Sequence, residues 1–212
     1  MKESLRTSRY PNRTSEDREL INQILDEARF CTVAYADDHV AHQIPTGFCR
    51  LEDEVYIHGS VKSHFISRLL ESPEVSLSIM LCDALVLAPT AFNHSVNYRS
   101  VVLYSGVREV RDVVQKARVL SAYTDKYIPG RMQDLPQPTP EELSVTTVLA
   151  LSTNKSLAKT RTGGVGVDTS KSNVWSGIVP VRMEYGTPEV DQGISHLETP
   201  HYLNQLITAN TL

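Results

Sequence analysis

Two runs rich in β-branched and aromatic residues, Phe30 to Ala36 and Val40 to Phe48, lie on either side of the acidic pair Asp37-Asp38. Such residues fit the pleated surface of a β-sheet, and a short polar turn between two of these runs indicates an antiparallel hairpin. The segment from Val75 to Ile79 alternates apolar and polar residues strictly, as does a strand with one buried face. The chain is therefore expected to fold around antiparallel strands.

Shorter segments continue this pattern along the chain. Further strands are expected at residues 54–58, 85–88, 98–110, 146–151 and 178–183. Helices are expected at residues 16–28, 65–70 and 112–127, and after the capping box Thr139-Pro140-Glu141-Glu142. Thr14 or Ser15 is expected to cap the first helix. Without βαβ alternation and without a GxGxxG or GxxxxGK motif, the chain is expected to be mainly β (α+β), a six- to seven-stranded antiparallel barrel with peripheral helices.

Length and charge narrow the possible functions. The 212 residues are expected to form a single domain, 1–212, with its core at about residues 14–185 and an extension at each end. A net charge of −4 provides no basic excess for binding nucleic acid. No apolar run approaches the ~20 residues that span a bilayer, and the first residues lack the apolar stretch of a signal peptide. We therefore expect a cytoplasmic protein without nucleic-acid or membrane partners.

The cysteines and histidines do not suggest a metal centre. Cys31, Cys49 and Cys82 each lie in an apolar run, and none belongs to a CxxC pair, so three buried, reduced thiols are expected. His39 and His42 are three residues apart on an expected strand and would point to opposite faces of the sheet. No metal site is therefore expected.

A first candidate site follows the strand at residues 54–58. His58, Gly59, Ser60, Lys62, Ser63 and His64 lie at the junction of that strand with a helix. The first turn of a helix offers unpaired backbone N–H groups and partial positive charge, which favour an anion such as a phosphate. A simple capped turn with a solvated lysine explains the same pattern.

A second candidate site lies at residues 93–100. This loop contains Asn97, Tyr98, Arg99 and Ser100 and no acidic residue, so it offers donors to an oxygen-rich or anionic ligand. The Arg99 guanidinium can donate two parallel hydrogen bonds to a phosphate or to the oxygens on a pyrimidine-type ring. Asn97 and Tyr98 could instead hydrogen-bond the backbone of their own loop.

Six motifs in order resemble the FMN-binding split-barrel proteins of the pyridoxamine 5′-phosphate oxidase superfamily, over roughly residues 5–185. They are residues 56–60 (Tyr-Ile-His-Gly-Ser), 83–88, 93–102, 129–131, 159–163 and 175–180 (Trp-Ser-Gly-Ile-Val-Pro). The branch that the chain resembles most is the flavin-nucleotide-binding group related to nitroimidazole-resistance reductases. The resemblance implies a split β-barrel that works as a homodimer and holds FMN at the subunit interface.

The resemblance also implies roles for particular residues. Gly59 to His64 would hold the FMN phosphate, although relatives usually carry Arg or Lys where this chain has His64, and Lys62 could compensate. The strand with Pro45 and Thr46 would bond the flavin ring through its backbone. Lys159 and Arg161 could close over the site, and Trp175 could stack on the flavin. A plain edge strand, a basic turn and a core or interface tryptophan are the alternative interpretations.

The expected function is that of an FMN-dependent oxidoreductase. NAD(P)H would reduce the flavin, and a small acceptor would take the electrons; no catalytic side chain is identified. The alternative is a non-catalytic split-barrel protein that binds a flavin, F420 or haem, with His58 or His94 as candidate haem ligands.

Overall fold

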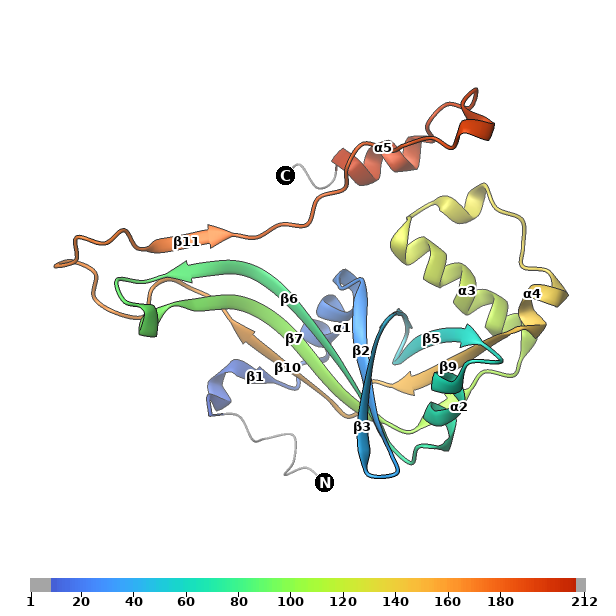
Figure 1. The fold of residues 1–212 in the computed structure, drawn as a ribbon, viewed down its shortest axis with the longest axis horizontal. Helices are drawn as coiled ribbons and strands as arrows, with labels where there is room; N and C mark the ends of the chain where they lie inside the picture. Colours follow the sequence, from blue (N-terminus) through green and yellow to red (C-terminus); the bar gives the residue numbers. More distant parts are fainter. Residues whose placement is uncertain (1–8, 209–212) are drawn as a thin grey trace.

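The computed structural model describes residues 9–208, which form two antiparallel sheets (Figure 1). The seven-stranded sheet has the order β1-β10-β7-β6-β2-β3, with β11 also paired to β6. Its strands are β1 (Thr14–Ser15), β2 (Phe30–Asp37), β3 (Val40–Gly47), β6 (Val75–Leu87), β7 (Ser95–Ser105), β10 (Ser156–Arg161) and β11 (Gly177–Pro180). The four-stranded sheet has the order β4-β5-β9-β8, with β4 (Cys49–Leu51), β5 (Glu54–Ser60), β8 (Val107–Glu109) and β9 (Thr146–Ser152).

Three connections join the two sheets at their corners. β3 continues into β4 through Phe48, β7 continues into β8 through Gly106, and a short turn links β9 to β10. Strands that change sheets in this way close two sheets around one interior. The antiparallel split barrel expected from the sequence is confirmed, and bends in the long strands raise the number of strand segments above six or seven.

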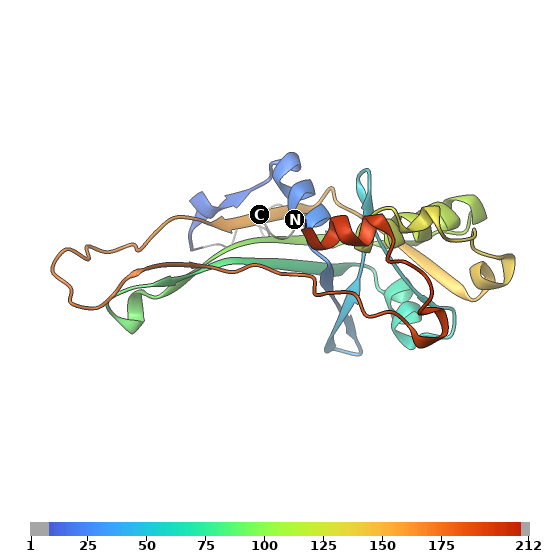
Figure 2. The same ribbon diagram turned by 90° about the horizontal axis from the view of Figure 1, so that it is seen from above.

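The helices surround this barrel. They are α1 (Arg18–Glu27), α2 (His64–Glu71), α3 (Val113–Tyr127), α4 (Pro140–Ser144) and α5 (His201–Thr208), with short 3-10 turns at Pro11–Arg13, Ala91–Asn93, Arg131–Gln133 and Gln192–Ile194. Figure 2 shows α1 against one face of the larger sheet, where it packs on β7 and β10. No helix in residues 9–208 is long and apolar enough to cross a membrane.

The predicted N-cap is confirmed at α4 and wrong at α1. The capping box at Thr139 is present, with its hydroxyl accepting from the N–H of Glu142. For α1, the prediction of Thr14 or Ser15 was wrong: Asp17 is the N-cap, and its carboxylate accepts from the N–H of Glu19. Thr14 and Ser15 instead pair with β10.

Two apolar clusters hold the fold together. The larger one lies inside the barrel, where side chains of α1 such as Ile24 and Leu25 meet strand residues such as Leu103, all fully buried. The smaller one lies between the four-stranded sheet and α3, around Cys49 and Val119. Burial of apolar surface on this scale is the main stabilising contribution to a domain of this size.

One edge of β6 is only partly covered. β2 pairs with the first part of this edge, up to Ser78, and β11 pairs with the last part, from Ala84. Met80, Leu81 and Cys82 lie between these two partners and have no paired strand on this side in the part of the chain that the structure describes. In Figure 1 this gap lies where the arm formed by β6, β7 and β11 meets the β2–β3 hairpin.

Candidate functional site

The turn from β5 into α2 has free hydrogen-bond donors. Ser63 is the N-cap of α2, and its hydroxyl accepts from the N–H of Ile66. The N–H groups of His64 and Phe65 find no acceptor within residues 9–208. Gly59 lies close to the side chain of Ile66, where a Cβ would come within 2.8 Å, so this strand end tolerates no side chain. The turn therefore has backbone donors available, and binding of an anion there stays a prediction.

Basic side chains gather around the same turn. Lys62 is exposed, and the N–H of Lys62 bonds to the hydroxyl of Ser60. One helical turn further on, Nε of Arg68 donates to Nε2 of His64 at 3.3 Å. The Arg68 guanidinium also pairs with Glu71 at 2.7 Å. Arg68 also lies 3.5 Å from Asp37, so its charge, which was not predicted, is already paired with two carboxylates.

The predicted ring-binding strand, β3, forms an edge of the larger sheet. Every second residue of an edge strand presents its backbone N–H and C=O outward, so the segment with Pro45 and Thr46 can bond a ligand through its backbone. Rings from α3 lie beside this strand end, with the hydroxyls of Tyr123 and Tyr127 against Gly47. This close approach of α3 was not visible in the sequence.

His58 faces α3 from β5. Its ring is half-buried and lies edge-on to Tyr123, with 4.4 Å between the ring centroids. Burial lowers the pKa of His58, so the imidazole is held in its neutral form. A neutral imidazole can hydrogen-bond a ligand or coordinate a metal. His94, the other histidine considered as a ligand, is exposed, and its Nδ1 lies 2.8 Å from the carbonyl oxygen of Thr90.

The second predicted group lies on the β7–β10 ladder, where Asn97 and Arg161 bond each other and Ser100 bonds the backbone of β10. Asn97 is buried, donates to the carbonyl of Gly163 at 3.0 Å and accepts from Arg161. The Ser100 hydroxyl donates to the carbonyl of Lys159 at 3.1 Å. The Asn97 bonds hold the glycine-rich segment that follows β10, and not the backbone of the loop that contains Asn97, as the alternative interpretation expected. Tyr98 is half-buried opposite Arg161.

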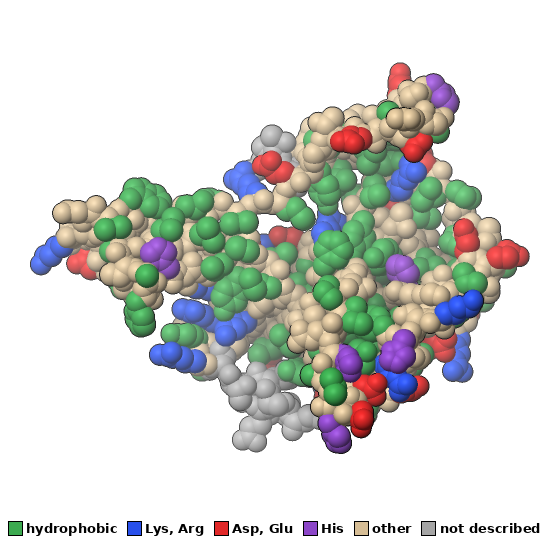
Figure 3. All heavy atoms as spheres, in the orientation of Figure 1, with side chains coloured by type: hydrophobic (Ala, Val, Ile, Leu, Met, Phe, Trp, Pro, Cys, Tyr) green, Lys and Arg blue, Asp and Glu red, His purple; other side chains and the backbone are tan. Residues whose placement is uncertain are grey.

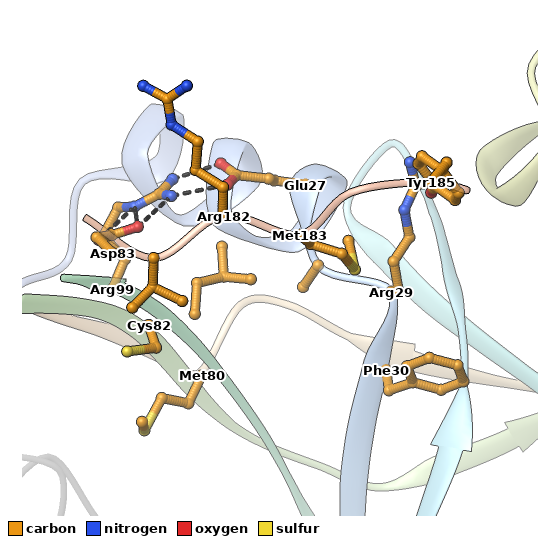
Figure 4. Close-up of a pocket in the computed structure, with 13 residues that line it drawn as sticks. Glu27, Arg29, Phe30, Met80, Cys82, Asp83, Arg99, Arg182, Met183 and Tyr185 are labelled. Atoms are coloured by element: carbon orange, nitrogen blue, oxygen red, sulfur yellow. Dashed lines mark hydrogen bonds and ion pairs between the residues drawn. The ribbon is translucent and has the colours of Figure 1, made fainter. Parts of the chain in front are cut away.

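Arg99 is held by two carboxylates (Figure 4). Its guanidinium pairs with both oxygens of Glu27 and with Asp83 at 2.7 Å. The hydrogen bonds that Arg99 donates to Glu27 and Asp83 raise the pKa of Arg99 further above its usual value. A cofactor that used this guanidinium would have to share it with these two acids.

Within one chain, the two predicted groups remain apart. Figures 1 and 2 show β5 and α2 near one end of the molecule and the first half of β7 in the arm that extends toward the other. Trp175 lies in the segment before β11, 67% exposed, with its ring over Gly177. A single ligand could contact both groups only if a second copy of the chain supplied one of them.

A pocket of about 630 Å³ occupies the gap along β6, and we call it the edge pocket. Figure 4 shows its lining. The residues are Glu27, Ala28, Arg29, Phe30, Met80, Leu81, Cys82, Asp83, Arg99, Val181, Arg182, Met183 and Tyr185. Of these, only Arg99 was a predicted site residue. The prediction that Cys82 is buried was wrong, because it lies on the uncovered edge of β6 and is exposed.

Lys126 lies between the edge pocket and the barrel. Its ammonium group donates to the carbonyl of Leu25, in the last turn of α1, at 2.7 Å, and lies 3.5 Å from the centroid of the Phe48 ring. Burial lowers the pKa of Lys126 to about 8. Within residues 9–208, no group of three or more His, Cys, Asp or Glu side chains is placed to hold a metal ion.

The lowered pKa of Lys126 predicts a dependence of stability on pH. Between about pH 8 and 10.5 the unfolded chain binds a proton at Lys126 that the folded chain has lost, so stability should rise across this range. We expect the free energy of unfolding of the wild type, relative to Lys126→Met, to increase by about 2 kcal/mol from pH 7.5 to pH 10. Urea titrations of both proteins measure this difference, and a constant difference would contradict the assignment.

Comparison with known proteins agrees with this architecture. A family model described as pyridoxamine 5′-phosphate oxidase matches residues 17–160. The flavocytochrome Anf3 from Azotobacter vinelandii is 30% identical, with a TM-score of 0.86 over 94% of each chain. The FAD and haem binding protein from Mycobacterium smegmatis is also 30% identical, with a TM-score of 0.86 over 92% of this chain and 97% of its own.

A proposed 5-nitroimidazole antibiotic resistance protein from Bacteroides thetaiotaomicron shares the fold. It is 19% identical, with a TM-score of 0.59 over 69% of this chain and 85% of its own. No curated protein matches the chain. The family model covers most of the sequence, and both 30%-identical structures extend the likeness to almost the whole chain. The chain belongs to the pyridoxamine 5′-phosphate oxidase family of split-barrel proteins.

Proposed function

We propose that this protein binds a flavin nucleotide and acts as a redox protein. The observation that carries the proposal is the similarity, over more than nine-tenths of the chain, to a flavocytochrome and to an FAD- and haem-binding protein. When bound, a flavin carries out the hydride and electron transfer, and the protein binds the flavin, orients it and shields it from solvent. This division of roles is consistent with the absence of an identified catalytic side chain in our sequence analysis.

The turn between β5 and α2 fits the phosphate of such a cofactor. Two backbone N–H groups in the first turn of α2 lack an acceptor within residues 9–208, and Lys62 adds positive charge at the same turn, whereas Arg68 is paired with Glu71 and Asp37. The outer edge of β3 offers backbone groups to the flavin ring, and the half-buried, neutral His58 lies on the neighbouring strand. FMN is the cofactor expected from the sequence, and FAD is the one that the relatives' names give.

A homodimer is part of the proposal. Large apolar side chains are exposed along the arm, among them Phe92 at 94%, Trp175 at 67% and Met80 at 67%. Figure 3 shows hydrophobic side chains gathered over the arm and around its junction with the barrel. Apolar surface of this extent on one face is typical of a protein interface. A partner would bring its β7–β10 ladder toward the β5–α2 turn, which joins the two predicted groups.

The electron donor and acceptor are proposed by class. NAD(P)H would reduce the flavin, and a small organic acceptor would reoxidise it. We also propose that the protein works in the cytoplasm, on the basis of its three free cysteines.

Haem is a second candidate ligand, alongside the flavin. Both 30%-identical structures are named for haem or cytochrome content as well as flavin. His58 is suited to ligation because its lowered pKa keeps the imidazole neutral. A non-catalytic carrier of flavin, F420 or haem is the alternative to an enzyme.

The visible spectrum of the purified protein, with the released chromophore identified by mass, tests these proposals. Two flavin bands with FMN or FAD released would support the main proposal and identify the nucleotide. Bleaching by NADH or NADPH without oxygen would support the oxidoreductase. A Soret band would add haem, and a colourless protein that takes up neither flavin nor haem would refute both.

Lys62 provides the test of the phosphate site. Lys62→Met should weaken flavin binding about tenfold, because a charge-assisted contact with the phosphate is lost. Lys171→Met is the matched control, since Lys171 is exposed in the segment between β10 and β11. Fluorescence titration of the flavin-free protein measures both affinities. Equal flavin affinity in the two variants would show that the phosphate does not bind at the start of α2.

A further inference from the structure

The edge pocket exposes part of the backbone of β6 as well as side chains. It exists because β2 and β11 cover β6 only up to Ser78 and from Ala84 onward. Backbone groups of the uncovered stretch can therefore reach whatever fills the pocket. Figure 3 shows a hollow beneath the C-terminal segment at this place, bordered by hydrophobic and basic side chains. A volume of about 630 Å³ is in the range of small-molecule sites.

The pocket carries a surplus of positive charge. Three arginines and two carboxylates line the pocket. Both carboxylates, those of Glu27 and Asp83, form ion pairs with Arg99. Arg182 makes no hydrogen bond or ion pair with any described residue. In Figure 4 its guanidinium projects from the C-terminal segment at the rim, next to the Arg99 ion pairs. One positive charge is thus left for a ligand.

Arg29, the third arginine of the pocket, is only partly hydrogen-bonded. One of its terminal nitrogens donates to the carbonyl of Lys126, and its guanidinium lies 5.9 Å from the centroid of the Tyr185 ring. Its Nε atom is buried and finds no acceptor within residues 9–208. A buried donor without an acceptor is costly and uncommon in native proteins. A ligand in the pocket could supply an acceptor only by displacing the atoms that cover this nitrogen.

The floor of the pocket is apolar and adaptable. Phe30, Met80 and Met183 are each more than 60% exposed, although they surround a concave site. Thioether side chains fill irregular gaps and make favourable contacts with aromatic rings. Figure 4 shows Phe30 and Met80 on one side of the site, and the guanidinium groups of Arg29 and Arg182 at opposite ends of the other side. The pocket is thus apolar at its floor and cationic at its rim.

We propose that the edge pocket binds a flat aromatic molecule that carries a carboxylate or a similar anionic group. The ring lies on Phe30, Met80 and Met183, the anion meets Arg182, and Arg29 adds positive charge from the other end of the site. Two sources share this chemistry: a small aromatic acid, and a porphyrin with its propionates. The porphyrin source rests on the haem proposed above, whereas the small-acid source is independent of it.

Calorimetric titration of the purified protein, with any bound flavin retained, tests this site. The probe is 2-naphthoate, and its neutral isostere 2-naphthamide is the control ligand. We expect one naphthoate per chain, bound at least tenfold more tightly than the amide, because only the carboxylate can pair with arginine. Equal binding of the two compounds, or no binding of either, would overturn the proposal.

Variants assign the binding to this pocket. Arg182→Met, at an exposed position, and Arg29→Met should each weaken naphthoate binding about tenfold. Arg118→Met is the control, since Arg118 is exposed on α3 and pairs with Glu52 at 3.2 Å. If Arg29→Met fails to fold, Arg182→Met still decides. Unchanged binding in Arg182→Met would overturn the proposal.

Competition between haemin and 2-naphthoate distinguishes a porphyrin from a small aromatic acid as the natural ligand. Displacement of naphthoate by haemin, with haemin affinity lowered in Arg182→Met, would support the porphyrin. Naphthoate binding that haemin does not disturb would support a small aromatic acid. Release of the flavin by naphthoate would place both in one site and overturn the proposal. A protein without flavin would refute the proposed function, but the naphthoate titration could still be read.

Discussion

Replacing Gly47 with alanine should lower the free energy of unfolding by about 3 kcal/mol. A Cβ at this position would lie 2.0 Å from the hydroxyl oxygen of Tyr123 and 2.5 Å from that of Tyr127. The Tyr127 hydroxyl cannot withdraw freely, because it accepts from the N–H of Phe48 at 3.1 Å and donates to the carbonyl of Arg29. The methyl group must therefore displace α3 from the barrel or break these bonds. Urea unfolding measures the loss.

Two further variants make this result specific. Gly164→Ala is the control, since nothing lies within 4 Å of a Cβ there, and it should change stability by less than about 0.5 kcal/mol. Tyr123→Phe removes the oxygen that lies nearest, so the Gly47→Ala/Tyr123→Phe double variant should regain part of the loss. A Gly47→Ala protein as stable as Gly164→Ala would show that α3 does not pack against β3 as described.

Replacing Arg99 with leucine should cost about 2 kcal/mol at pH 7, because two carboxylates lose the counter-charge that they share. Arg99 and Asp83 are about 30% exposed, which keeps the loss below that of a fully buried pair. Glu27 is the last residue of α1, where the partial negative charge of the helix end adds to the repulsion. Thermal or urea unfolding of the variant gives the value.

The control and the rescue both follow from the geometry. Arg108→Leu breaks an ion pair of the same length, 2.7 Å to Glu54, but Arg108 is 52% exposed, and its loss should cost less than about 1 kcal/mol. Adding Asp83→Asn to Arg99→Leu removes one of the stranded charges and should restore part of the stability. If both arginine variants lost the same amount, the Arg99 pairs would be ordinary surface contacts.

The Arg99 variant also tests the predicted cofactor contact. If Arg99 binds the flavin, Arg99→Leu should contain less flavin when purified, even under conditions in which it is folded. Unchanged flavin content would limit Arg99 to holding α1 against β6 and β7.

Local signals in the sequence predicted local structure well. The β2–β3 hairpin follows from its composition, and its turn places Asp38 and His39 at φ 45° and 64°, as a two-residue hairpin turn requires. The β5–α2 turn was predicted because strand, glycine and helix cap are consecutive. Thr14 and Ser15 were misassigned because their partners, Lys159 and Ala158, lie almost a whole chain away. No local pattern records such a pairing.

The edge pocket could not be predicted for the same reason. It is built from four separate segments, and it exists because two strands stop short of each other along β6. Arg99 was singled out correctly as an unusual arginine, but its partner Glu27 belongs to a helix 72 residues earlier in the chain. The approach of Tyr123 and Tyr127 to Gly47 likewise depends on the packing of α3, which no motif encodes.

The pairing of β1 with β10 has a consequence for synthesis of the protein. The hairpin of β2 and β3 and the long pair of β6 and β7 can form while later residues are still inside the ribosome. β5 and β1, however, wait for β9 and β10, the partners that close both sheets. Contacts between such distant segments form slowly, and exposed strand edges favour aggregation until they form. A pause in translation before residue 146 would therefore leave β1, β5 and β7 each lacking a partner strand from later in the chain, and chaperones would be needed most at that stage.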